Sequence, residues 1–149
     1  MGLKERLRTD LTEAIRSRDQ ITSGTIRMVL TAITNEEVSG KSVRELTEAE
    51  VITVLSREAK KRKEAAEAFD AGARPEKATL ERAEGEVIAK YLPSQLSEDE
   101  LATMIKEAIA ETGASGPSGM GLVMKALSPK IAGRADGATV SAAVKTALA

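Results

Sequence analysis

The chain of 149 residues carries 22 Lys and Arg against 23 Asp and Glu, so its net charge of −1 supplies no overall field that attracts nucleic acid. It contains neither cysteine nor histidine, which excludes disulfides, thiolate or imidazole metal ligands, and catalysis by an imidazole base. Phe69 and Tyr91 are its two aromatic residues, too few to recognise single-stranded nucleic acid by base stacking.

Other classes are disfavoured by missing patterns. No apolar run approaches the roughly 20 residues that a membrane-spanning helix needs, and the N-terminus has no apolar signal-peptide core. We therefore expect a cytoplasmic protein with no membrane partner. The sequence also shows no phosphate-binding loop and no cluster of metal-ligating residues, so we expect no cofactor and no metal.

Four helices are predicted in the first two thirds of the chain, because apolar residues recur there at helical spacing. Thr47 and Glu50 have the spacing of a capping box and mark the start of the third helix. Gly72 is expected to end that helix, and Pro75 is typical of the first turn of the next one. The predicted helices span residues 3–18, 23–38, 48–71 and 75–92.

Two charged residues interrupt apolar stripes on adjacent predicted helices. At 100° per residue, Arg62 falls in the middle of the stripe on the third helix and Glu84 in the middle of the stripe on the fourth. The short connection between these helices makes them antiparallel neighbours. A catalytic acid is one interpretation, but we favour a structural ion pair between Arg62 and Glu84, because unpaired buried charges are costly.

The C-terminal third is predicted to be a separate small bundle. Pro93 stops the fourth helix, and Ser97 with Glu100 forms a second capping-box pattern. No stretch alternates with the period of two that strands require, so the fold class is all-α. The domains are predicted at residues 1–93 and 94–149. The C-terminal helices are predicted at residues 98–111, 118–131 and 139–148.

Glycine punctuates this bundle. No strand precedes the pattern Gly119-Met120-Gly121 and no Gly-Lys-Ser/Thr follows it, so a nucleotide loop is disfavoured. These glycines are expected to open a helix and to let another helix approach closely. Gly133 and Gly137 are expected to form the tight connector before the last helix. Asp136 between them is a turn residue that is expected to cap this helix.

The small bundle is polarised in charge. Residues 97–112 have a net charge of −4, whereas residues 113–149 have a net charge of +3, with Asp136 as their one acid. An ordinary solvated surface explains such charges, but a basic end of the bundle is also able to rest on phosphates of an RNA backbone. The candidate RNA-binding cations are Lys125, Lys130, Arg134 and Lys145.

Three short segments of the last third carry a resemblance. They are Tyr91-Leu92-Pro93-Ser94-Gln95-Leu96-Ser97, Met120-Gly121-Leu122-Val123-Met124 and Gly133-Arg134-Ala135-Asp136-Gly137. In this order and spacing they resemble the YqeY-like family, whose C-terminal domain is shared with the tail of GatB, a subunit of the tRNA-dependent amidotransferase. The segment Lys60-Lys61-Arg62 and Glu84 also look like this family.

The resemblance implies a larger N-terminal helical domain, a small C-terminal bundle, and a link to tRNA-dependent amidation, a carbon–nitrogen ligase reaction with glutamine as amido donor. The expected function is a non-catalytic accessory module that binds tRNA or associates with a tRNA-modifying enzyme. A protein–protein adaptor without RNA binding is the alternative. An autonomous amide-transferring enzyme is least favoured, because the ATP-dependent body of GatB is missing. We assign no catalytic residue.

Overall fold

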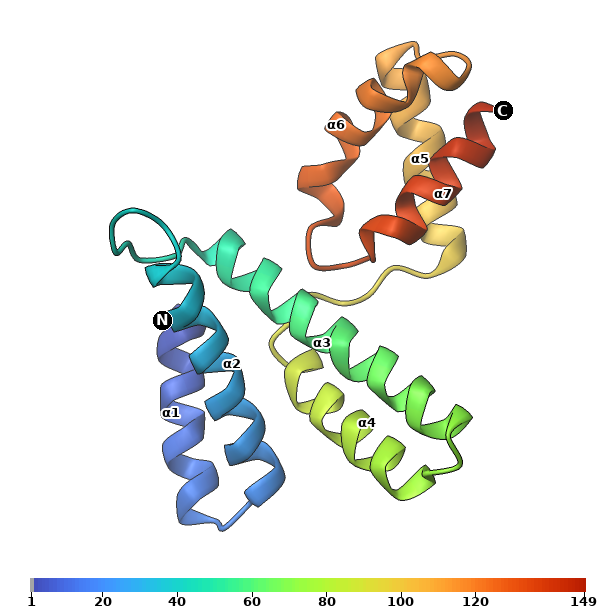
Figure 1. The fold of residues 1–149 in the computed structure, drawn as a ribbon. Coiled ribbons are helices and arrows are strands. Elements are labelled where there is room, and N and C mark those ends of the chain that lie inside the picture. Colours follow the sequence, from blue (N-terminus) through green and yellow to red (C-terminus); the bar gives the residue numbers. More distant parts are fainter. Residues whose placement is uncertain (1) are drawn as a thin grey trace. The chain divides into compact units, whose positions relative to one another are not determined.

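The computed structural model describes residues 2–149, and within that range it contains seven α-helices, one short 3₁₀ helix and no strand (Figure 1). The all-α class predicted from the sequence is confirmed. The α-helices are α1 (Leu3–Arg16), α2 (Gln20–Val38), α3 (Glu48–Ala71), α4 (Pro75–Ala89), α5 (Glu98–Thr112), α6 (Met120–Ile131) and α7 (Gly137–Leu148), and the 3₁₀ helix spans Pro117–Gly119.

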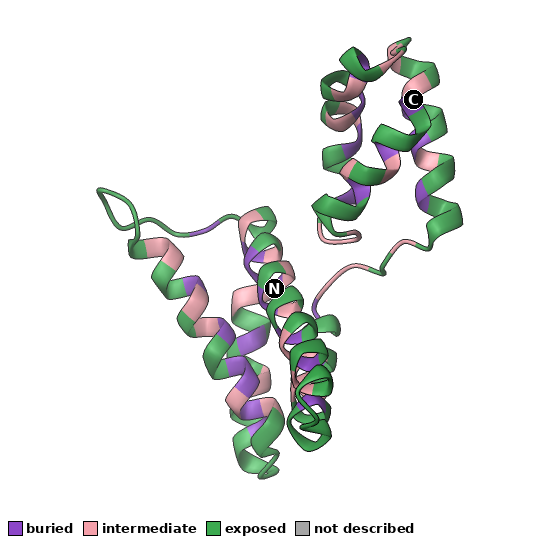
Figure 2. Ribbon diagram, turned by 45° about the vertical axis from the view of Figure 1, so that its right-hand side comes forward, coloured by how far each residue is buried: buried purple, intermediate pink, exposed green. Residues whose placement is uncertain are grey.

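The helices form two compact units, Met1–Leu92 with α1–α4 and Pro93–Ala149 with α5–α7. Each unit has its own buried apolar cluster, and Figure 2 shows buried residues along the inward faces of the helices in both. The division lies one residue before the predicted boundary at residues 93 and 94. That each unit folds on its own remains a prediction.

The first unit is built from two helical hairpins, α1 with α2 and α3 with α4, and α2 also packs against α3 and α4 (Figure 1). Aliphatic residues such as Leu7, Ile33 and Leu55 form its core. Two large apolar residues of this unit face outward: Ile15 is 50% exposed and Leu80 is 47% exposed. The small side chains of Ala14 and Ala78 on the same helices are buried.

Both hairpin turns end their first helix with a Schellman motif. After α3, Arg74 N donates to Phe69 O at 2.8 Å and Ala73 N donates to Asp70 O at 3.2 Å. Ala73 takes the left-handed conformation with φ of 57°, whereas Gly72 has φ of −86°. Gly72 caps the helix as predicted, but the residue that needs a positive φ is Ala73. After α1, Arg18 takes the same left-handed conformation, with φ of 59°.

Replacing Ala73 by Gly is expected to stabilise the protein by about 0.5–1 kcal/mol, because glycine removes the left-handed strain and loses only part of that gain to its greater freedom in the unfolded chain. Urea unfolding measures the change. As the matched control, Ala68→Gly at an exposed position inside α3 is expected to cost about 1 kcal/mol. Equal destabilisation by both substitutions contradicts this account of the turn.

The second unit is a three-helix bundle of α5, α6 and α7. Ser97 and Asp136 cap α5 and α7 by accepting hydrogen bonds from Glu100 N and Thr139 N, so the predicted caps are confirmed. Their side-chain oxygens satisfy amides that have no partner within the helix.

The glycines of this unit differ in role. A Cβ on Gly119 would lie 2.8 Å from Ala114 Cβ, whereas Gly121 and Gly137 have open space where a Cβ would stand. Of the two glycines in the pattern Gly119-Met120-Gly121, Gly119, which precedes α6, is therefore the one that packs closely against a neighbour. Gly133 has φ of 74°, a conformation that side chains disfavour, and the connector before α7 requires it.

Candidate functional site

Two charged residues of α3 are buried in the first unit, Arg62 at 8% exposed and Glu58 at 7% exposed. The guanidinium of Arg62 donates from one terminal nitrogen to Glu58 Oε2 at 2.9 Å and to Glu58 O at 3.3 Å, and from the other to Met28 Sδ at 3.4 Å. Its Nε lies 3.6 Å from Glu84 Oε2 and has no hydrogen-bond partner. Arg62 therefore forms the predicted ion pair with Glu84, but Glu58 is the acid that accepts hydrogen bonds from its guanidinium.

Sequence reasoning missed Glu58 as the main partner of Arg62. The signal was present, because a Glu four residues before an Arg on one helix is a favourable pair. Burial raises the pKa of Glu84, with a further increase from the charge of Glu81, and the attraction of Arg62 opposes both effects. Because the charged side chains of this cluster pair with one another within α3 and between α3 and α4, we interpret the cluster as structural.

Tyr91, the first residue of the segment at residues 91–97, packs within the first unit. Its hydroxyl donates to Asp10 Oδ2 at 2.5 Å, and Arg6 lies over its ring at 4.8 Å from the ring centre. Burial, followed by the hydrogen bond to Asp10, raises the pKa of Tyr91. Tyr91 is 8% exposed and is not available to stack on a base.

Two of the three segments that carried the resemblance, residues 91–97 and 133–137, meet in space. Gln95 Nε2 donates to Gly133 O at 2.8 Å, and Leu96 N donates to Arg134 O at 2.9 Å. Arg134 Nε in turn donates to Ser94 O at 3.0 Å. Arg134, predicted to contact RNA, thus holds the segment before α5 against the connector between α6 and α7.

The other candidate cations differ in their surroundings. Lys130 lies 3.5 Å from Glu111, and both side chains are well exposed. Lys125 and Lys145 are exposed, and neither forms an ion pair with any residue in the described range 2–149. Lys145 lies in the last turn of α7, whereas Arg134 precedes the first turn. The four cations therefore do not gather at one end of the bundle.

An apolar groove lies between α5 and α7 on the second unit. Its volume is about 670 Å³. Sequence reasoning did not predict it, because half of its lining residues are alanine and threonine, which carry no functional signature. The lining residues are Glu98, Leu101, Ala102, Ile105, Lys106, Ile109, Thr139, Ala143, Thr146 and Ala147.

The arrangement defines a class of protein before any comparison: an all-helical, two-unit protein with a structural ion cluster in one unit and an apolar groove in the other. Within residues 2–149 no three His, Cys, Asp or Glu side chains are placed to hold a metal ion. None of the helices in that range is long and apolar enough to cross a membrane.

Comparison with known proteins names the family. The sequence model described as Yqey-like protein matches residues 4–148, so the chain belongs to the YqeY-like family. A curated relative from Clavispora lusitaniae, altered inheritance of mitochondria protein 41, mitochondrial, is 33% identical over 93 residues. The match covers 62% of this chain and 53% of the relative, so the chain spans about half the length of that protein. Since that relative is named as mitochondrial, the cytoplasmic location stays a prediction for this chain.

Proposed function

We propose that this protein is a non-catalytic accessory module of tRNA-dependent amidation, and that its second unit contacts the tRNA backbone. The observation that carries the proposal is the net charge of +3 over residues 113–149, with Lys125 and Lys145 exposed and not ion-paired within the described chain. Exposed ammonium groups without acidic neighbours are free to neutralise phosphates. The resemblance of this unit to the GatB tail supports tRNA as the RNA.

The expected mode of recognition follows from which side chains are present. Phe69 is half-buried and Tyr91 is buried, so bases have little to stack on and the shape and phosphates of the RNA are recognised instead. Lys130 and Arg134 are partly engaged by Glu111 and Ser94. Lys125 and Lys145 are therefore expected to dominate, with a modest affinity that depends strongly on salt.

The test is the double variant Lys125→Ala with Lys145→Ala, titrated with tRNA between 50 and 200 mM salt. We expect weaker binding and a salt slope reduced by about 2, one for each lost phosphate contact. Thermal stability is expected to change little, because exposed charges contribute little to folding. Arg134 is unsuitable for this test, because its removal also breaks the contact with Ser94.

The matched control removes two exposed lysines from the first unit, Lys41 and Lys63. This variant has the same net charge as the first, so any difference in tRNA affinity reports position and not total charge. Equal losses in both variants indicate non-specific attraction, and unchanged affinity in the first variant contradicts the proposed contact.

The alternative function, a protein–protein adaptor without RNA binding, is favoured by one specific observation. The α5–α7 groove presents apolar surface that no other residue of the unit Pro93–Ala149 covers. Such hollows between helices commonly receive apolar side chains of a partner. If the purified chain binds no tRNA at any salt concentration, the adaptor replaces the proposed function.

A further inference from the structure

The two walls of the groove on the second unit carry side chains of different size. Leu101, Ile105 and Ile109 line its α5 side with large aliphatic side chains. Ala143 and Ala147 line its α7 side, where small side chains leave the groove open. Ile105 is 2% exposed, so the floor is continuous with the core of the unit. A partner side chain that enters the groove would therefore contact a fixed apolar surface.

The groove is long enough to bind an α-helix of about three turns. Its lining runs along α5 from Glu98 to Ile109, a length of about 16 Å at a rise of about 1.5 Å per residue. This length corresponds to about three helical turns. Its two walls are helices in contact with each other, and the small residues Ala102 and Ala143 allow a third backbone to approach closely.

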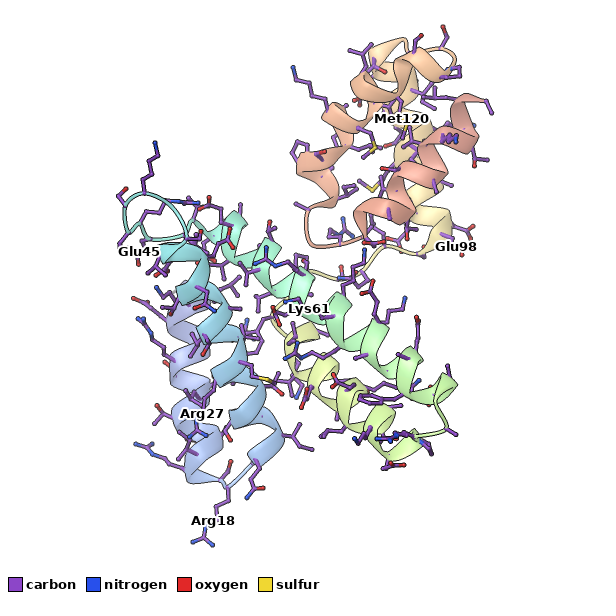
Figure 3. The ribbon with its side chains drawn as sticks, in the orientation of Figure 1. Arg18, Arg27, Glu45, Lys61, Glu98 and Met120 are labelled. Carbon is purple, nitrogen blue, oxygen red and sulfur yellow. The ribbon has the colours of Figure 1, made fainter. Side chains whose placement is uncertain are left out.

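The charges around the groove are arranged unequally along it. Glu98, Asp99 and Glu100 stand at the first turn of α5, all exposed and without an ion pair in the described range, and Figure 3 shows Glu98 projecting from this turn. Lys106 lies on the wall two turns further along. The acidic end repels phosphates and attracts cations, so the groove is complementary to a protein segment with a basic end and not to RNA.

We propose that the α5–α7 groove binds an amphipathic α-helix of a partner protein. The helix presents an apolar stripe of about three turns to Ile105 and Ile109, and a Lys or Arg at one of its ends lies beside Glu98, the acid that lines the groove. This recognition mode, an apolar helical face laid into a groove with anchors at i, i+3 or i+4, and i+7, is widespread. It goes beyond the proposed tRNA contact, which uses Lys125 and Lys145 and not the groove.

The substitution that tests the groove is Ala102→Arg. Ala102 lines the groove and is exposed, so arginine is expected to fill the groove without disturbing the core, and arginine favours helix formation. Ala110→Arg is the matched control, because Ala110 is an exposed residue of the same helix outside the groove. Both variants have the same charge, and circular dichroism verifies that both keep their helix content.

The probe is a display library of helical peptides of about four turns with randomised surface positions, selected on the purified full-length chain. We expect enriched peptides with apolar residues at i, i+3 or i+4, and i+7 and with Lys or Arg at one end. Individual peptides are expected to bind Ala102→Arg at least about tenfold more weakly, and Ala110→Arg about as tightly as the unchanged chain. Binding is expected to weaken with added salt and in Glu98→Gln.

Four results overturn the proposal. The first is that no peptide prefers the unchanged chain over Ala102→Arg, and the second is that acidic peptides are enriched. The third is a dimer of the unchanged chain that becomes a monomer in Ala102→Arg. The fourth is loss of tRNA binding in Ala102→Arg but not in Ala110→Arg. The third assigns the groove to a second copy of the chain and the fourth assigns it to RNA. Because tRNA affinity is measured separately through Lys125 and Lys145, either proposal can fail without the other.

Discussion

Replacing Glu58 by Ala is expected to destabilise the first unit by about 3–5 kcal/mol, because it leaves the guanidinium of Arg62 buried without its main partner. Arg62 and Glu58 are 8% and 7% exposed, and the substitution removes the hydrogen bond that Arg62 donates to Glu58 Oε2 at 2.9 Å, whereas the bond to the backbone oxygen of Glu58 remains. Glu84 Oε2, at 3.6 Å from Arg62 Nε, is too distant to replace the lost bond without movement. Urea unfolding followed by circular dichroism measures the loss.

The matched substitution is Glu84→Ala. From the sequence, removal of Glu84 is expected to cost as much as breaking a buried pair, but the structure lowers this expectation to about 1 kcal/mol or less. Glu84 keeps 18% of its side chain exposed and makes no hydrogen bond to Arg62. A cost for Glu84→Ala that equals or exceeds that for Glu58→Ala contradicts the ranking and restores Glu84 as the main partner.

A third variant distinguishes the cost of an unpaired buried charge from the cost of lost packing at Arg62 and Glu58. Replacing Arg62 by Met and Glu58 by Leu together removes both buried charges and keeps apolar volume, and such exchanges are often neutral or stabilising. We expect the double variant to be more stable than Glu58→Ala by several kcal/mol, on the order of the cost of one unpaired buried charge. A double variant no more stable than Glu58→Ala indicates that lost packing, and not the unpaired charge, causes the damage.

Replacing Leu127 by Ala is expected to unfold the second unit and leave the first unit native. Leu127 is 0% exposed in the core of α5, α6 and α7, and such truncations cost about 2–5 kcal/mol. A unit of about 57 residues has a total stability of only about 3–9 kcal/mol, so most of it is lost. Hydrogen exchange measures the result as lost protection after Leu92 and retained protection before it.

The control for this prediction is Leu122→Ala, which removes the same atoms from α6 at a position that is 56% exposed. Its expected cost is within about 0.5 kcal/mol, because little apolar surface leaves the core. If Leu127→Ala instead unfolds α1–α4 together with α5–α7, the two compact units fold as one cooperative structure. The prediction that the two domains unfold independently is then wrong.

The amino-acid sequence by itself determined the class of the fold and several helix ends. Helical periodicity predicted seven helices because inward positions must be apolar every three or four residues. The starts of α3 and α5 were predicted at Glu48 and Glu98, where the structure places them, because Thr47 and Ser97 satisfy the first amides of those helices through their own side chains. These are local interactions, and local interactions can be read from neighbouring residues.

Only the tertiary structure decided which residues meet. Periodicity placed Arg62 on a buried stripe, but the choice between Glu58 and Glu84 as its partner depends on rotamers and on the spacing of α3 and α4. The engagement of Arg134 by Ser94 joins residues 40 positions apart. The α5–α7 groove exists because small residues on one helix face large ones on another, and no sequence period records that pairing between helices.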